Sequence, residues 1–195
     1  MNKERAVLIH SYLADRKDKE KPDRLTRLGL LAASELYRHG EIDKICITVE
    51  PELSRPQVKR LRRLLNDPPE EDIISKEETV TTEGEVKSFK NAVEEKNWRN
   101  PLTIGNETHI PRIKREIRKT FKEASIETTT PRKVLARYPR YSSILKEMDG
   151  WPEQLSLSRH ERVLNIPVIG KIIERAIPLR WKIALQSWVF KQLER

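Results

Sequence analysis

Apolar residues follow two kinds of spacing along this chain. Short runs rich in aliphatic or β-branched residues, typical of strands, lie at 6–10, 44–49, 72–75, 101–105 and 125–130. The segments between them place apolar residues three or four positions apart, as on one face of an amphipathic helix. These apolar stripes lie at 25–36, 58–65, 86–93 and 110–121. The chain therefore alternates between strand and helix as far as residue 130.

This alternation predicts right-handed βαβ units and hence a doubly wound α/β fold. We expect a mostly parallel sheet of about five strands with helices on both faces. Cys46 should be buried within the second strand, because an inner parallel strand is covered on both sides. In the common strand order 3-2-1-4-5, the first and fourth strands are neighbours.

Helix boundary signals agree with this pattern. Ser54 is placed to cap the second helix, and Gly40 to end the first. Thr82 and Glu85 have the spacing of a capping box at the start of the third helix. Pro111 lies in the first turn of the fourth, where a missing N–H costs nothing. Each expected helix thus has a signal at one of its ends.

The character of the chain changes after Thr130. The stretch "RYPRYSSILKEMDGWPEQLSLS" has no sustained period and predicts a connecting region with one short helix. A helical stretch follows from Ser158, and its last segment places Trp181 and Trp188 on one face. That face either meets a membrane interface or packs on the protein. We expect a domain of residues 1–130 with a helical extension, 131–195, packed on it, because about 65 residues bury too little surface to be stable alone.

The charge balance favours an anionic partner. Lys and Arg number 39 against 30 Asp and Glu, a net charge of +9. This suits nucleic acid, a phosphorylated small molecule or an anionic membrane surface, and the alternative is a solvated lysine-rich surface. Basic clusters at 59–63 and 114–119 lie opposite the apolar stripes without interleaved aromatic residues. Any nucleic-acid binding is therefore expected to be weak and non-specific.

Several classes of protein are excluded or disfavoured. No run approaches the roughly 18 apolar residues of a membrane span, and no signal-peptide pattern opens the chain. A single cysteine excludes an internal disulfide and a cysteine metal cluster. These features favour a cytoplasmic protein. The dinucleotide, P-loop, zincin and nucleophile-elbow motifs are all absent, so motifs identify neither a cofactor nor a reaction.

Candidate site residues come from their positions at strand ends. His10 closes the first strand and His109 follows the fourth, in "GNETHIPR". If those strands are neighbours, both histidines face one crevice beside helix N-termini, which favour anions. Arg112, one turn further, has the geometry to pair with a phosphate or carboxylate. The alternative is that His109 only caps its helix and His10 is a half-buried strand end.

Three segments resemble the ElyC/SanA/YdcF family, a bacterial domain of unknown function. They are "DRLTRLGLLAASELYRHG", "TTEGEVKSFKNAV" and "TIGNETHIPR", and the resemblance covers roughly residues 6–130. The positions that match the family pattern are Arg27, Leu28, Tyr37, Gly40, Thr82, His109, Pro111 and Arg112. The chain departs from the family in lacking glycine-rich turns after the first two strands, and Glu85 replaces an expected asparagine.

The resemblance implies a Rossmann-like fold, and family members are linked to cell-envelope biogenesis and to S-adenosylmethionine binding. No reaction is established for the family as a whole. The resemblance and the positions of the candidates at strand ends together give a hypothesis of function. His10, His109 and Arg112 line a site for a nucleotide-like, S-adenosylmethionine-like or phosphorylated anion, with Thr82 and Arg27 approaching from neighbouring helices.

Each candidate has an expected part in this site. His109 is the candidate catalytic residue, because imidazole exchanges protons near neutral pH. Glu85 either orients Arg27 or Arg112, or repels the ligand. Metal binding by the histidines is the lesser alternative, because two histidines and one glutamate from separate loops are the minimum for zinc and nothing in their spacing selects it. The alternative function is a non-enzymatic basic protein that contacts nucleic acid, an anionic membrane or a protein partner, so whether the chain is an enzyme stays open.

Overall fold

The computed structural model of the chain describes residues 4–10, 24–48, 51–75, 81–121 and 126–151. The chain divides into two compact units, residues 1–145 and residues 146–195. The first unit holds the sheet and the helices around it, and all of the candidate site residues lie in it.

The centre of the fold is a five-stranded sheet in the order β3-β2-β1-β4-β5. Its strands are β1 (Ala6–Ile9), β2 (Lys44–Ile47), β3 (Ile73–Ser75), β4 (Leu102–Ile104) and β5 (Glu127–Thr129). Every pair is parallel, with Leu8 level with Cys46 on one side and with Thr103 on the other. The expected α/β class is confirmed, the architecture is Rossmann-like, and the strand order is the common one in which the first and fourth strands are neighbours.

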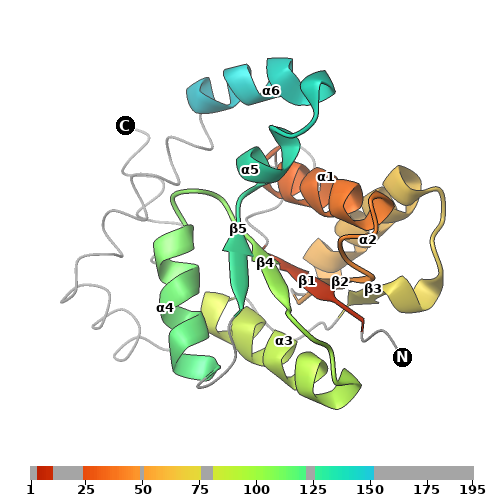
Figure 1. Cartoon of the computed structure of the whole chain (residues 1–195), viewed down its shortest axis with the longest axis vertical. Helices are drawn as coiled ribbons and strands as arrows, with labels where there is room; N and C mark the ends of the chain where they lie inside the picture. The colour runs from red at the N-terminus through yellow and green to blue at the C-terminus, as the bar shows by residue number, and fades with distance from the viewer. Residues whose placement is uncertain (1–3, 11–23, 49–50, 76–80, 122–125, 152–195) are drawn as a thin grey trace. The chain divides into compact units, whose positions relative to one another are not determined.

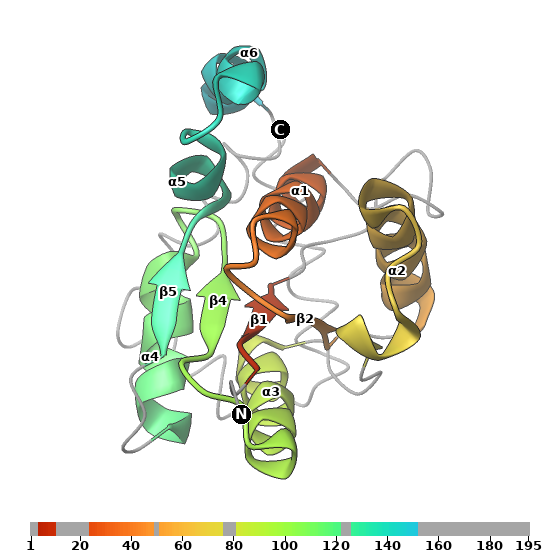
Figure 2. The same ribbon diagram turned by 45° about the vertical axis from the view of Figure 1, so that its right-hand side comes forward.

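Helices cover both faces of the sheet (Figure 1). Helices α1 (Arg24–Arg38) and α2 (Pro51–Leu65) pack together on one face. Helices α3 (Thr82–Lys96) and α4 (Ile110–Thr120) pack together on the other, as the turned view in Figure 2 also shows. Leu8, Cys46 and Phe89 belong to the core beneath α3 and α4, and Cys46 is buried as expected.

Two helix starts differ from the sequence expectation. Helix α2 begins at Pro51, so Ser54 is a buried residue inside it instead of its cap. The first turn accepts Pro51 because that position needs no N–H donor. The cap of α3 is Thr81, whose side chain accepts a hydrogen bond from the Gly84 N–H at 3.1 Å. Thr82 is therefore not the cap, and its hydroxyl is available for another contact.

After β5 the chain continues through short helical pieces. They are α5 (Pro131–Leu135), a 3-10 turn (Pro139–Tyr141), α6 (Ser142–Glu147) and a second 3-10 turn (Met148–Gly150). Helix α5 packs against α1, so the first compact unit extends beyond Thr130. The expected packing face at Trp181, Leu185 and Trp188 lies outside the described residues. Within the described ranges, no helix combines the length and apolarity that a bilayer crossing requires.

Candidate functional site

The first candidate, His10, lies directly beyond β1 at the C-terminal edge of the sheet. Its backbone N–H donates to the Ile104 carbonyl at 3.0 Å, which extends the pairing of β1 with β4 by one residue. Alternation along the strand places His10 on the same face as Leu8, toward α3 and α4. Only 1 % of His10 is exposed, so the residue is fully buried and not the half-buried strand end that the alternative interpretation described.

Glu85 is the partner of His10. Its carboxylate lies 2.7 Å from Nδ1 of His10, and both side chains are buried. Thr81 caps α3, and Glu85 then lies one turn inside that helix. The helix points this turn at the C-terminal edge of the sheet, where negative charge is favoured by the exposed N–H groups. The carboxylate thus contacts a histidine that the sequence interpretation did not pair with it.

His109 lies at the same edge of the sheet, in the loop between β4 and α4. Asn106 forms the turn before it, because its side-chain Oδ1 accepts from the Thr108 N–H at 3.2 Å and hydroxyl at 3.0 Å. The Asn106 carbonyl then accepts from the His109 N–H at 2.9 Å. His109 occupies the N-cap position of α4 but makes no side-chain capping hydrogen bond. Helix capping therefore does not explain its side chain.

Instead, the His109 ring is paired with Thr82. Its Nε2 lies 2.9 Å from the Thr82 hydroxyl, and both side chains are buried. The rings of His10 and His109 lie 5.9 Å apart between centroids and are tilted by 58°. The structure thus brings together four candidates, His10, Glu85, Thr82 and His109, as two hydrogen-bonded pairs with adjacent rings.

These pairs lie where the strand order reverses. The chain builds outward from β1 to β2 and β3, then crosses to β4 on the other side of β1. Ligands of open α/β sheets bind at this point, outside the carboxyl ends of the strands. The buried polar pairs therefore occupy the edge at which a ligand is expected.

The two candidate arginines lie in first turns of helices that follow these strands. Arg112 is half-buried at the start of α4, and Arg27 is half-buried in the first turn of α1. Burial lowers the pKa of Arg60 in α2, and the positive charges of Arg27 and Arg63 lower it further. Three guanidinium groups thus share one region of α1 and α2, which favours an anion there.

The described residues include no group of three or more histidine, cysteine, aspartate or glutamate side chains arranged to hold a metal ion. The chemistry that the described pairs offer is hydrogen bonding and proton exchange. Two imidazoles and one carboxylate can exchange protons, and the Thr82 hydroxyl can donate or accept a hydrogen bond.

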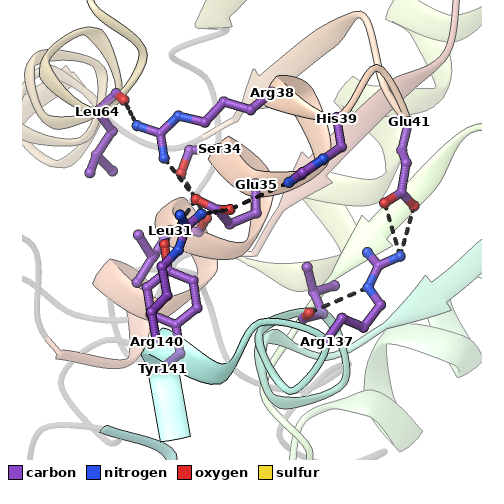
Figure 3. Close-up of polar contacts among 11 residues, drawn as sticks. Leu31, Ser34, Glu35, Arg38, His39, Glu41, Leu64, Arg137, Arg140 and Tyr141 are labelled. Atoms are coloured by element: carbon purple, nitrogen blue, oxygen red, sulfur yellow. Dashed lines mark hydrogen bonds and ion pairs between the residues drawn. The ribbon is translucent and has the colours of Figure 1, made fainter.

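A second polar centre, which sequence reasoning missed, surrounds Glu35 in the last turn of α1 (Figure 3). Its fully buried carboxylate accepts from Arg38 at 2.7 Å and from the Tyr141 hydroxyl at 2.9 Å, and it also pairs with Arg140. Burial raises the pKa of Glu35, but these hydrogen bonds outweigh it, and the net pKa is below the ordinary value. The sequence does hold one signal for this centre: Glu35 is a charged residue on the apolar face of an amphipathic helix, where a carboxylate needs buried partners.

Comparisons with protein-family models, with curated proteins and with solved structures found no match.

Proposed function

We propose that this chain binds a small anionic molecule, nucleotide-like, S-adenosylmethionine-like or phosphorylated, at the C-terminal edge of β1 and β4. The observation that carries the proposal is the pair of buried contacts, His10 with Glu85 and His109 with Thr82, at the reversal of strand order. Buried polar side chains cost free energy, so a cluster of them at this edge is better explained by a ligand than by stability.

The charges around the edge support an anion over a neutral molecule. Helices α3 and α4 begin there, and their N–H groups carry partial positive charge. Arg112 adds a fixed charge in the first turn of α4, and Arg27 does so in the first turn of α1. Arginine suits this task because its planar fork pairs two oxygens of a phosphate or carboxylate at once.

The resemblance to the ElyC/SanA/YdcF family agrees with this proposal and is itself part of it. The family pattern places a histidine, a proline and an arginine after the fourth strand, and here these are His109, Pro111 and Arg112 at the start of α4. In the proposed site His109 contacts the ligand from this helix, while Thr82 holds its ring in position.

A thermal-shift screen of the full chain with nucleotides, S-adenosylmethionine and sugar phosphates tests the proposal. A compound at a hundred times its dissociation constant adds about 2.7 kcal/mol of stability, which raises the melting temperature of a protein of this size by roughly 5–10 °C. Arg112→Ala should reduce the shift strongly. Arg118→Ala is the matched control, because Arg118 is exposed in the last turn of the same helix.

His109→Gln and Thr82→Val complete the test, because each alters one side of the contact between these residues. If no compound stabilises the wild type, or if the Arg112 variant responds like the Arg118 variant, the proposed site is wrong.

A further inference from the structure

The two histidines of the site differ in how their ring nitrogens are used. Nδ1 of His10 contacts the Glu85 carboxylate at 2.7 Å. Nε2 of the same ring is buried and has no hydrogen-bond partner within the described part of the chain. His109, by contrast, uses its Nε2 for the Thr82 hydroxyl. His10 therefore combines a carboxylate on one ring nitrogen with an unpaired second nitrogen.

The carboxylate determines which nitrogen of His10 carries the proton. An ionised carboxylate only accepts hydrogen bonds, so the Nδ1 of His10 must donate its hydrogen to Glu85. The neutral ring then has a bare Nε2 with a lone pair available. A buried polar atom without a partner is unfavourable because it has lost its hydrogen bonds to water, and a bound hydrogen-bond donor would remove this cost.

We infer that His10 is the proton-transferring residue of this site and that Glu85 is its positioning residue. The inference rests on the proposed function, and it moves the acid–base role from His109, the sequence candidate, to His10. The molecule bound must therefore carry, or bring with it as water, a hydroxyl group that reaches Nε2 of His10. A phosphorylated or other anionic molecule with a hydroxyl group fits both this atom and the arginines.

The proton step is balanced within the site. The O–H bond of the bound hydroxyl or water breaks, its electron pair stays on the oxygen, and an N–H bond forms at Nε2 of His10. The imidazolium formed this way is stabilised by the Glu85 carboxylate, which stays ionised. Return of the proton to an oxygen restores the neutral ring. His109, held by Thr82, then serves to orient the ligand.

The first test is the tautomer of His10 in the full ligand-free chain, measured by nitrogen-15 NMR. We expect Nδ1 to be protonated and Nε2 bare in the wild type. A ring protonated at Nε2 alone would overturn the inference even if the site binds ligands. Glu85→Gln keeps an acceptor for Nδ1 but removes the charge.

The second test measures proton uptake when sulfate binds, by calorimetry in buffers of different ionisation enthalpy. Sulfate carries no proton near neutral pH, so any proton taken up belongs to the protein. We expect uptake in the wild type, little or none in His10→Asn, and a reduced value in Glu85→Gln. The asparagine amide replaces Nδ1 toward Glu85 and lacks a counterpart of Nε2, so the variant should keep its fold.

His109→Gln is the matched variant, because its amide replaces Nε2 toward Thr82. It should bind sulfate more weakly but still take up a proton. Uptake that persists in His10→Asn, or that disappears in His109→Gln while sulfate still binds, would assign the proton to His109 and overturn the inference. Absence of sulfate binding to the wild type would instead overturn the proposed function, so the two failures are distinguishable.

Discussion

Replacing Glu35 with glutamine should destabilise the first compact unit without touching the candidate site. Glu35 is fully buried in the last turn of α1, and it holds the 3-10 turn that follows α5 through Arg140 and Tyr141 (Figure 3). Glutamine keeps the shape and one acceptor oxygen but loses the charge. Its amide group also presents hydrogens to donors, where a carboxylate oxygen was before.

The magnitude follows from the contacts. A hydrogen bond to a charged group contributes about 1.5–3 kcal/mol and a neutral one about 0.5–1.5. The Tyr141 contact at 2.9 Å and the Arg38 contact at 2.7 Å both weaken on this scale. The Arg38 side chain is 41 % exposed, so solvent screens its share. We expect a loss of about 2 kcal/mol in the free energy of unfolding.

Urea unfolding followed by circular dichroism measures this loss, and hydrogen exchange in residues 131–145 reports whether the contact region opens first. Glu41→Gln is the control. Glu41 pairs with Arg137 at 2.9 Å, but their side chains are 36 % and 45 % exposed, so its loss should stay within about 0.5 kcal/mol. Equal free energies of unfolding for the two variants would refute the reasoning, because the buried contacts of Glu35 would then stabilise the fold no more than the exposed pair of Glu41.

The pH dependence gives a further check on Glu35. Its pKa in the folded chain lies below the ordinary value of 4.5, so its contribution is fully present above that pH and is lost as pH falls through the lowered value. The stability gap between wild type and Glu35→Gln should therefore be constant between about pH 5 and 7. It should close only below pH 4.5. A gap that closes above pH 5 would contradict the pKa direction.

Further predictions concern other parts of the fold and the surface charge. Gly105→Ala should cost about 1–3 kcal/mol in thermal unfolding, because a Cβ there would lie 2.1 Å from Cδ1 of Ile113, and adding Ile113→Val should recover part of the loss. Thr81→Ala should cost about 1 kcal/mol, measured by urea unfolding, through loss of the α3 cap. Burial and the hydrogen bond to Asp72 raise the pKa of Tyr37 to about 12, so an absorbance titration should contain a component near pH 12, and Tyr37→Phe should remove that component. The contribution of the protonated Tyr37 hydroxyl to the free energy of unfolding is complete below pH 10 and is lost as pH approaches 12. Nucleic-acid binding, measured by fluorescence anisotropy, should be weak and should fall steeply with salt, since the sequence contains no recognised base-reading motif.

Local pattern alone determined the architecture of the first unit. Apolar runs and helical stripes follow each other regularly, and the connection rules for parallel strands leave few ways to arrange them. The strand order, the burial of Cys46 and the start of α4 near Pro111 were therefore predictable. The positions of His10 and His109 at one sheet edge follow from the same rules, since β1 and β4 are neighbours.

The pairing of side chains at that edge depended on the tertiary structure. Sequence spacing made Thr82 a cap and did not pair Glu85 with His10, whereas in the fold Thr82 contacts His109 and Glu85 contacts His10. Because Thr81 is the cap, Thr82 is the first residue of α3, and its hydroxyl contacts His109 instead of capping the helix.

The contact between Glu35 and Arg140 was hidden for a related reason. The two residues are 105 positions apart, and no local period relates the last turn of α1 to the turn that follows α5. Local spacing determines which residues share a strand or a helix face, because it is set by backbone geometry. Which polar groups then satisfy one another in the interior is decided only when separate elements pack, because a buried donor or acceptor takes whichever partner the packing brings within reach.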